Sequence, residues 1–365
     1  MKISYLSNSP LANAPANAVH VMNMCSCFAK NGHRVVLHAQ GDKKKSPGIF
    51  FKKYGVDDNF DLQLVRMLRI KFLGAFLYGF LQAIVALKTI KPDLFYARCL
   101  YSAFFVVLFK RKLILELHEV PHNFVVNKLL WFMLRSSYLE RIVVISDALR
   151  LDLSDSFPSM INKDVVVAHD GANVPEPSNF CLLYPQNINI GYAGGLRSGN
   201  GLDLILELAK SNPQYTFNIA GGSSVDVEEW KAKQKSENVY WYGRLSPADV
   251  SGFLAANDIL LAPYQLGPKT GSGRDTSRWM SPLKIFEYMA VSRASIVSDY
   301  PVLREVLNND VSFLIEPSDF DAWNDALNKL ASNWSLRTVM GERAFTLLQA
   351  RYTWRSRSSA VLAGL

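Results

Sequence analysis

Residues 187–210, NINIGYAGGLRSGNGLDLILELAK, decide the fold of the chain. An apolar run, a glycine-rich turn and an amphipathic helix follow one another, the pattern of a buried parallel strand that leads into a helix. Glycines at such a turn let the backbone approach a phosphate, and the helix N-terminus supplies unpaired N–H groups. Gly194, Gly195 and Arg197 are therefore candidate anion contacts. The turn lacks the Walker lysine and a complete G-x-G-x-x-G, so an ordinary tight turn is the alternative.

The same alternation of strand and helix continues on both sides of this segment. Short apolar strands between helices predict parallel sheets that are covered by helices on both faces. The expected strands are 2–7, 33–39, 93–98, 112–118, 141–146, 164–169, 187–195, 215–222, 238–244, 258–264 and 294–299. The expected helices are 18–32, 71–90, 100–109, 125–138, 147–155, 202–212, 247–256, 283–291, one that begins at Val302, and 335–362.

A proline-containing stretch, Asn173 to Asn179, interrupts the alternation, and the pattern then starts again. Ligands of such α/β domains bind beyond the carboxyl ends of the strands, and a cleft between two domains is the expected site. The expected parts are a first domain at 1–173, a linker at 174–187, a second domain at 188–345 and a C-terminal helix at 346–365.

Composition narrows the functional classes. With 365 residues, 49% hydrophobic and 20% charged, the chain is globular and long enough for two domains. Its four cysteines are scattered, which disfavours a disulfide framework or a zinc site and predicts a reduced, cytoplasmic protein. Residues 1–175 carry a net charge of +9 and residues 176–365 carry −1. The first half is either a mildly basic solvated domain or the part that meets an anionic lipid or a phosphorylated substrate.

The most apolar stretch is FLGAFLYGFLQAIVAL at 72–87. Its sixteen residues are fewer than the ~20 that span a bilayer, and they include Gln82. Two interpretations stay open: a helix packed under the sheet, or a helix on a membrane surface between Lys71 and Lys88. The first residues, Met1 to Leu6, predict a buried strand rather than a signal peptide.

A second anion-binding helix end is predicted at 281–290, SPLKIFEYMA. Ser281 and Pro282 look like an N-cap followed by a proline in the first turn, which leaves the next backbone N–H groups for a ligand. Glu287 lies one turn further into the helix, where a carboxylate can accept hydrogen bonds from both hydroxyls of a ribose. The glycine turn and this helix end would together cradle a diphosphate.

These segments resemble the family 4 glycosyltransferases, which have the GT-B fold and retain the anomeric configuration. SPLKIFEYMA followed by SIVSDYPVLREVL is similar to the family's donor-binding signature. GYAGGLRSGNGLDLILELA, FNIAGG, NVYWYGRLSPADV, DILLAPY and VHVMNMCSCFAKNGHRVVLHA are similar to further blocks in order. The resemblance covers most of the chain. It implies two Rossmann-like domains that face each other across a deep cleft, with a C-terminal helix that returns to the first domain.

The resemblance also implies a donor site in the second domain. Glu287 corresponds to the glutamate that holds the ribose, and Leu283 and Lys284 to the positions whose N–H groups hold the diphosphate. Arg244 and Leu245, in YGRLS, correspond to the turn that contacts the base. The full set of predicted donor contacts is Gly194, Gly195, Asn200, Arg244, Leu245, Ser281, Pro282, Leu283 and Glu287.

Two departures from the family pattern concern charged groups. Trp279 stands where the first glutamate of E-x7-E is expected, so Ser281, Asp275 or the backbone would contact the donor sugar instead. Gly195 and Asn200 fall where the family has the arginine and lysine of G-R-x-x-x-x-K-G. The replacement cations are sought among Arg197, Lys284 and Arg274.

The first domain is expected to bind the acceptor. His118, at the end of LELH, corresponds to a histidine near the sugar and the acceptor in many family members, and Glu119 lies beside it. The other predicted acceptor contacts are Asn17, His20 and Arg98. His20 is equally well explained as a plain helix residue.

The implied reaction is retaining transfer of a hexose-type sugar from a UDP- or GDP-linked donor to a glycan or a polyprenyl-diphosphate-linked acceptor. Such a reaction serves bacterial surface polysaccharide synthesis, in a lipopolysaccharide or a capsule, with peripheral contact to the inner face of the cytoplasmic membrane. No cofactor and no metal are expected, since no Asp-x-Asp stands in a donor-site context and Asp319 predicts a helix N-cap. The predicted catalytic residues are His118, Glu287, Arg197 and Lys284.

Two other functions stay open. A sugar-nucleotide epimerase of the same fold needs a carboxylate and a histidine placed for proton abstraction. A relative without activity would bind nucleotide sugar and not turn it over. A nicotinamide dehydrogenase is disfavoured, because Asn8-Ser9-Pro10 follows the first strand in place of a glycine fingerprint. Nucleic-acid binding is disfavoured, because the basic runs lack interleaved aromatic residues.

Overall fold

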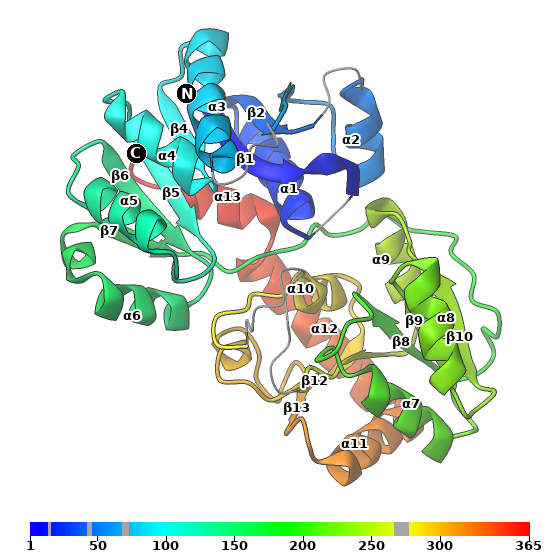
Figure 1. Cartoon of the computed structure of the whole chain (residues 1–365). Helices are drawn as coiled ribbons and strands as arrows, with labels where there is room; N and C mark the ends of the chain where they lie inside the picture. The colour runs from blue at the N-terminus through cyan, green and yellow to red at the C-terminus, as the bar shows by residue number, and fades with distance from the viewer. Residues whose placement is uncertain (14–15, 42–45, 68–72, 266–276) are drawn as a thin grey trace. The chain divides into compact units, whose positions relative to one another are not determined.

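The computed structural model describes residues 1–13, 16–41, 46–67, 73–265 and 277–365. The chain divides into two compact units. The first unit comprises Met1–His169 and the C-terminal Trp354–Leu365, and the second comprises Asp170–Thr353. Each unit has its own parallel sheet with helices around it (Figure 1).

Within the described residues the first unit holds a seven-stranded sheet of order β3-β2-β1-β4-β5-β6-β7, with every pair parallel. Its strands are β1 Lys2–Pro10, β2 Arg34–Gln40, β3 Asp61–Val65, β4 Leu94–Ala97, β5 Leu113–Leu117, β6 Leu139–Val144 and β7 Asp164–Val167. Its helices are α1 Ala16–Lys30, α2 Gly48–Tyr54, α3 Gly74–Ile90, α4 Leu100–Leu108, α5 Phe124–Leu134, α6 Asp147–Ser156 and α13 Trp354–Leu362.

The second unit holds a six-stranded parallel sheet of order β10-β9-β8-β11-β12-β13 among its described residues. Its strands are β8 Asn189–Ala193, β9 Thr216–Ala220, β10 Val239–Gly243, β11 Ile259–Ala262, β12 Ala294–Ser298 and β13 Phe313–Ile315. Its helices are α7 Leu202–Ser211, α8 Ser224–Lys233, α9 Pro247–Ala255, α10 Leu283–Ala290, α11 Phe320–Ser332 and α12 Trp334–Arg351.

Each sheet has one point where the order of its strands reverses. In the first unit this point lies between β1 and β4, and in the second between β8 and β11. Of the strands beside these points, β4, β8 and β11 are buried along their length, as expected for parallel strands covered on both faces. In open α/β sheets ligands bind at the carboxyl ends of these strands. The turn after Ala193 and the residues after Ala262 are therefore the places to look for a ligand in the second unit.

The helix expected at 71–90 packs against the sheet of the first unit as α3. Gln82 is fully buried there, and its Nε2 donates to the carbonyls of Ser7 and His38, each at 2.8 Å. Hydrogen bonds inside the unit therefore satisfy Gln82, the polar residue within the apolar stretch at 72–87. A search of the described residues found no helix with the length and apolar character needed to cross a membrane.

The structure corrects several local expectations. The helix expected from Val302 is only a 3-10 turn at Leu303–Glu305, because Asn308, Asn309 and Asp310 favour a turn before β13. The helix expected at 335–362 is interrupted at Tyr352 and Thr353, where the chain passes from α12 in the second unit to α13 in the first. The sequence patterns did not predict α2, α8, β3 or β13. Asp319 does cap α11, as expected, through its bond from the Ala322 N–H at 3.0 Å.

Candidate active site

Two glycine-containing turns meet at the carboxyl ends of β8 and β9. The Gly194 N–H donates to the Ala220 carbonyl at 3.0 Å. Gly221 has a φ of +136°, and a Cβ there would lie 1.7 Å from the Gly194 carbonyl oxygen. A side chain at 221 would push the two turns apart, so glycine is required for this backbone-to-backbone contact.

The carbonyl of Gly195 is held by two side chains. The Asn200 Nδ2 donates to it at 2.9 Å, and the Tyr192 hydroxyl donates at 2.8 Å. Asn200, predicted as a donor contact, braces the turn in this structure. The turn after β8 is therefore fixed before any ligand arrives, which lowers the entropy cost of binding.

Lys284 brings the second predicted segment to the same turn. Its Nζ donates to the Tyr192 hydroxyl at 3.3 Å and lies 4.3 Å from the Tyr192 ring centroid and 4.7 Å from that of Tyr264. A Cβ added at Gly194 would lie 2.9 Å from this Nζ. A lysine ninety positions along the chain thus places its ammonium in contact distance of the glycine turn.

The pKa values of Lys284 and Glu287 are both shifted toward neutral pH. Burial lowers the pKa of Lys284 to about 7, and the neighbouring Glu287 opposes that shift. Burial raises the pKa of Glu287 to about 7, and Lys284 opposes that shift. Two desolvated groups with their pKa values near 7 are a common mark of a functional site, because a ligand can complete what the protein leaves unpaired.

The N-terminus of α10 differs from its sequence-based expectation. Pro282 occupies the N-cap position, and no side chain caps the helix. Ser281 lies one residue before the N-cap, and its hydroxyl accepts a bond from the Asp170 N–H at 2.8 Å, so the predicted cap is wrong. The backbone N–H groups of Leu283 and Lys284 begin the helix beside the ammonium of Lys284, which adds the helix dipole to the positive charge there.

Arg197 and Arg244 lie on the turns after β8 and β10, and both are exposed. The pKa of Asp226 is lowered, first by bonds from the backbone and hydroxyl of Ser223 and then by these two arginines. Both cations are therefore within electrostatic reach of one carboxylate. Leu245 and Trp279 are partly buried. The other replacement candidates, Arg274 and Asp275, lie outside the described residues.

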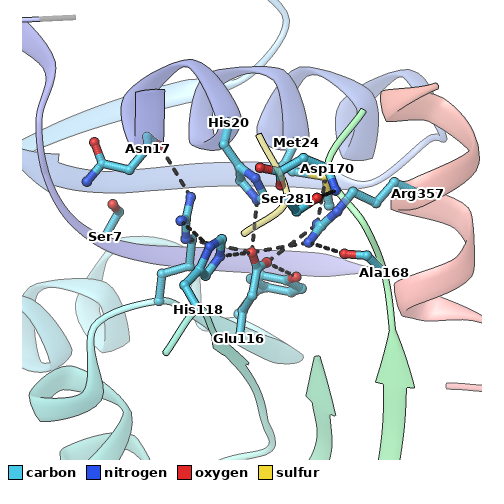
Figure 2. Close-up of polar contacts among 12 residues, drawn as sticks. Ser7, Asn17, His20, Met24, Glu116, His118, Ala168, Asp170, Ser281 and Arg357 are labelled. Carbon is cyan, nitrogen blue, oxygen red and sulfur yellow. Dashed lines mark hydrogen bonds and ion pairs between the residues drawn. The ribbon is translucent and has the colours of Figure 1, made fainter. Parts of the chain in front are cut away.

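The first unit contains a buried ionic cluster that we call the Glu116 cluster: Glu116, His118, His20, Arg98, Tyr96 and Arg357. Glu116 is on the interior strand β5 and is 2% exposed. Its Oε1 lies 2.5 Å from His118 Nε2, 3.0 Å from His20 Nε2 and 3.2 Å from an Arg357 nitrogen. Its Oε2 accepts from the Tyr96 hydroxyl and from Arg357 at 3.5 Å. Figure 2 shows these groups converging on the carboxylate from α1, β5 and α13.

His118 is held at both ring nitrogens. Nε2 faces Glu116, and Nδ1 lies 3.3 Å from a terminal nitrogen of Arg98. Burial first and the charge of Arg98 second lower the pKa of His118 to about 4, against the opposing effect of Glu116. The ring is neutral at physiological pH, so Nε2 carries the proton for the carboxylate and Nδ1 accepts from Arg98.

The other predicted acceptor contacts are spread around this cluster. Asn17 is exposed, and its carbonyl accepts from Arg98 at 3.2 Å. Glu119 is partly buried directly after His118. His20 is 1% exposed and faces Glu116 rather than solvent. The structure thus brings Asn17, Arg98 and His118 together at the ends of β4 and β5.

His20, Glu116 and His118 offer ligand atoms within 4.8 Å of one another, the only such trio found in the described part of the chain. The chemistry of the set does not fit a metal ion. Guanidinium groups of Arg357 and Arg98 lie 3.2 and 3.7 Å from the same carboxylate oxygen and would repel a cation. The trio is therefore an ion-paired cluster.

Sequence reasoning did not single out Glu116, Arg357 or Tyr192. A signal for Glu116 was present, because a glutamate inside the apolar run LILELH must have a buried partner. The identity of that partner was not readable, since Arg357 lies 241 positions away. Tyr192 is part of a buried strand and shows no polar pattern of its own.

Each of the two units matches a model of a known protein family. Residues 18–174 match the family "Glycosyltransferase Family 4", and residues 182–346 match "Glycosyl transferases group 1". TuaH of Bacillus subtilis (strain 168), whose name assigns it to teichuronic acid biosynthesis as a glycosyltransferase, is 25% identical over 155 residues. That match covers 41% of this chain and 37% of the relative, so the chain spans little more than a third of that protein's length.

Solved structures share the fold along the whole chain. HepE of Anabaena, in complex with UDP and glucose, has a TM-score of 0.75 at 16% identity and covers 100% of both chains. A variant of TarM of S. aureus has a TM-score of 0.72 at 11% identity and covers 99% of both chains. WaaG, a glycosyltransferase involved in lipopolysaccharide biosynthesis, has a TM-score of 0.67 at 14% identity. The chain therefore has the GT-B fold, and its two units match two glycosyltransferase family models, family 4 in the first and group 1 in the second.

Proposed function

We propose that the chain is a retaining glycosyltransferase that moves a hexose-type sugar from a UDP- or GDP-linked donor to a glycan or a polyprenyl-diphosphate-linked acceptor. The observation that carries the donor assignment is the position of Lys284. Its ammonium lies beside Gly194 at the turn after β8, at the N-terminus of α10. This is the arrangement that a diphosphate requires: a cation, free N–H groups and a backbone without side chains in the way.

The second unit would act on the leaving group. As the bond from sugar to phosphate breaks, negative charge grows on the β-phosphate oxygen, and the Lys284 ammonium and the α10 N-terminus would stabilise it. Removal of one donor of this kind costs about 10²–10³ in rate. Glu287 would accept the ribose hydroxyls one turn further along. The leaving phosphate would take the acceptor's proton on the same face of the sugar, so that configuration is retained without a carboxylate nucleophile.

The relatives support a role in polysaccharide synthesis. TuaH is named for teichuronic acid biosynthesis, WaaG for lipopolysaccharide biosynthesis, and HepE was solved with UDP and glucose. In the first unit, Arg98 and His118 stand at the carboxyl ends of β4 and β5 with the backbone of Asn17. We assign the acceptor to this edge, together with Glu119.

The epimerase alternative needs a carboxylate and a histidine that reach the substrate. The structure does pair Glu116 with His118, but the Glu116 side chain is wholly buried and ion-paired. A carboxylate in that state is a poor general base, because taking a proton would break its bonds to Arg357 and the histidines. The pairing therefore favours transfer over proton abstraction.

A membrane-facing surface is proposed on α5. Phe124, Trp131 and Phe132 are exposed at 72%, 51% and 44%. Lys128 lies over the Phe124 ring at 4.9 Å and Arg135 over the Trp131 ring at 3.3 Å. Exposed aromatic residues interleaved with cations are typical of a helix that lies in the interface of an anionic bilayer, where a polyprenyl-linked acceptor would be held.

Vesicle sedimentation tests this surface. The wild-type protein is expected to bind vesicles of phosphatidylglycerol and phosphatidylcholine and to be released by salt. Trp131→Ser combined with Phe124→Ser should lose binding. Trp334→Ser, at a tryptophan of the second unit that is 71% exposed, is the control and should bind like the wild type. Equal binding by all three proteins would remove α5 from the proposal.

Nucleotide binding tests the donor site. UDP or GDP is expected to raise the melting temperature, and a ligand at 100 times its Kd adds about 2.7 kcal/mol. Glu287→Gln should abolish most of that shift. Glu207→Gln, on the exposed face of α7, makes the same chemical change away from the site and should leave the shift intact. No shift with either nucleotide, or equal shifts in both variants, would contradict the donor assignment.

The proposed mechanism uses lysine and helix charge in place of a divalent ion. The UDP- or GDP-induced shift should therefore be the same in EDTA and in MgCl₂ or MnCl₂. A shift that appears only with one of these ions would show that the protein's own cations are not sufficient.

A further inference from the structure

Arg357 belongs to α13, the last helix of the chain, yet it is part of the first unit and is 3% exposed. The chain leaves this unit at His169 and comes back to it at Trp354. Helix α13 packs beside α1 after its return, as Figure 1 shows in red and blue. A buried arginine this late in the chain joins the segment that leaves the unit and the helix that returns to it.

The guanidinium of Arg357 contacts two backbone carbonyls, a methionine sulfur and a carboxylate. Nε donates to the His169 carbonyl at 2.9 Å, and one terminal nitrogen donates to the Ala168 carbonyl at 3.1 Å. The other contacts the Met24 sulfur at 3.4 Å, and both terminal nitrogens reach the Glu116 carboxylate (Figure 2). A planar fork with partners on every side holds one orientation, which a lysine would not reproduce.

The charge state of Glu116 in turn determines which ring nitrogen of His118 carries the proton. Burial alone would raise the pKa of Glu116, and Arg357 above all, with His20 and His118, holds it well below its usual range. The carboxylate therefore stays ionised and can only accept hydrogen bonds. His118 Nε2, at 2.5 Å, must donate to it, and Nδ1 is left as the acceptor toward Arg98.

We propose that Arg357 is a positioning residue: it keeps Glu116 ionised, and Glu116 in turn fixes His118 as the neutral tautomer with its proton on Nε2. This inference rests on the proposed function for the meaning of His118, which is 27% exposed beside the predicted acceptor edge. It adds a residue of the C-terminal helix to the machinery of the first unit. A ring fixed in one tautomer and one orientation presents the same face to every substrate molecule.

Loss of Arg357 has a defined chemical consequence. Without its largest counter-charge, Glu116 would take up a proton at a higher pH than in the wild type. A protonated carboxyl donates a hydrogen bond, so His118 Nε2 would become the acceptor and the ring proton would move to Nδ1. Arg98 already points a donor at Nδ1, so the ring would also have to shift.

The test is the tautomer of His118 in the ligand-free, full-length protein with ¹⁵N-labelled histidine, read by two-bond ¹H–¹⁵N correlation spectra between pH 8 and 5. The signal is assigned by its loss in His118→Gln. The wild type is expected to keep the proton on Nε2 across this range. In Arg357→Met and in Glu116→Gln the Nδ1–H tautomer should appear, and in Arg357→Met its share should grow as the pH falls. Arg357→Lys, which keeps the charge, should restore most of the Nε2–H tautomer.

Arg141 provides the matched control. It is another buried arginine of the first unit that holds α13, through its bond to the Val361 carbonyl at 2.9 Å, and it pairs with Asp164 instead of Glu116. Arg141→Met should loosen the same helix and leave the His118 spectrum unchanged. The proposal fails if Arg141→Met alters the tautomer as much as Arg357→Met does. It also fails if Arg357→Met keeps the wild-type spectrum, whatever the spectrum of Glu116→Gln.

These spectra need no nucleotide and no acceptor. A protein that keeps the predicted tautomer but shows no shift with UDP or GDP would leave this inference standing and remove the proposed function. UDP- or GDP-induced stabilisation is expected to be unchanged in Arg357→Met, because Lys284 and Glu287 lie in the second unit. If Arg357→Met does not fold, Glu116→Gln, which preserves the shape of the side chain, carries the test.

Discussion

The two units surround a glutamate in opposite ways: Glu116 is buried, whereas Glu287 is only partly buried. In the first, Glu116 accepts from His118, Tyr96 and Arg357 and lies 3.0 Å from His20 Nε2, and its pKa is held well below its usual range. In the second, burial raises the pKa of Glu287 to about 7, with Lys284 as its opposing neighbour. Both lie near the switch point of a parallel sheet. From this difference we infer that the protein itself satisfies Glu116, and we propose that a ligand satisfies Glu287.

The largest expected effect concerns stability. Glu116→Ala leaves Arg357 and Arg98 as buried cations without their carboxylate, which should lower the free energy of unfolding by about 3–5 kcal/mol. Glu287→Ala removes a carboxylate whose ionised form is already disfavoured by burial, so its cost should stay within about 1 kcal/mol. Thermal and chemical unfolding of both variants measures the contrast. Equal losses would show that the two glutamates play the same structural part.

The next effect is on the pH dependence of nucleotide affinity. Lys284 must be protonated to pair with a diphosphate, so affinity should fall as the pH rises above 7. Glu287 must be ionised to accept ribose hydroxyls, so affinity should also fall as the pH drops below 7. Each limb is expected to approach tenfold per pH unit, which is about 1.4 kcal/mol.

Calorimetric titration of UDP or GDP from pH 5.5 to 8.5 measures this curve. Lys284→Met should flatten the alkaline limb, and Glu287→Gln should flatten the acidic limb, each with weaker binding overall. If the affinity of the wild type does not change across this pH range, neither Lys284 nor Glu287 contacts the nucleotide. His118, with its pKa lowered to about 4, contributes neither limb.

The smallest expected effect concerns the position of the Lys284 ammonium beside Gly194. A Cβ at Gly194 would lie 2.8 Å from the Tyr192 hydroxyl and 2.9 Å from Lys284 Nζ. Gly194→Ala should therefore displace the ammonium by a few tenths of an ångström and weaken UDP or GDP about three- to tenfold, which is about 0.7–1.4 kcal/mol. Some loss of stability is also expected, because the Tyr192 ring is buried and would have to move with the ammonium. Unchanged affinity would mean that the diphosphate does not use this turn.

Much of the fold was predictable because parallel strands leave a strong pattern. Runs such as LILEL and NIGYA are buried along their length, and the structure confirms two parallel α/β sheets. Strand β3 escaped prediction because its residues alternate between exposed and buried and include Gln63. Strand β13 escaped because it has only three residues after a turn-rich stretch.

The candidate site was predictable to the extent that its residues are neighbours in sequence. The segments around Gly194 and Lys284 each carry a local pattern, a glycine turn and a helix start. Their meeting depends on the order β9-β8-β11-β12, which no local pattern states. The Arg357 contact with Glu116 depends on the chain's return to its first unit, so it required the structure.

The most direct test of the central claim is a crystal structure with UDP or GDP bound. The account predicts a diphosphate oxygen within hydrogen-bond distance of Lys284 Nζ and of the backbone N–H groups of Leu283 and Lys284, with the ribose hydroxyls on Glu287. A diphosphate bound elsewhere in the second unit, with Lys284 still against Tyr192, would contradict it.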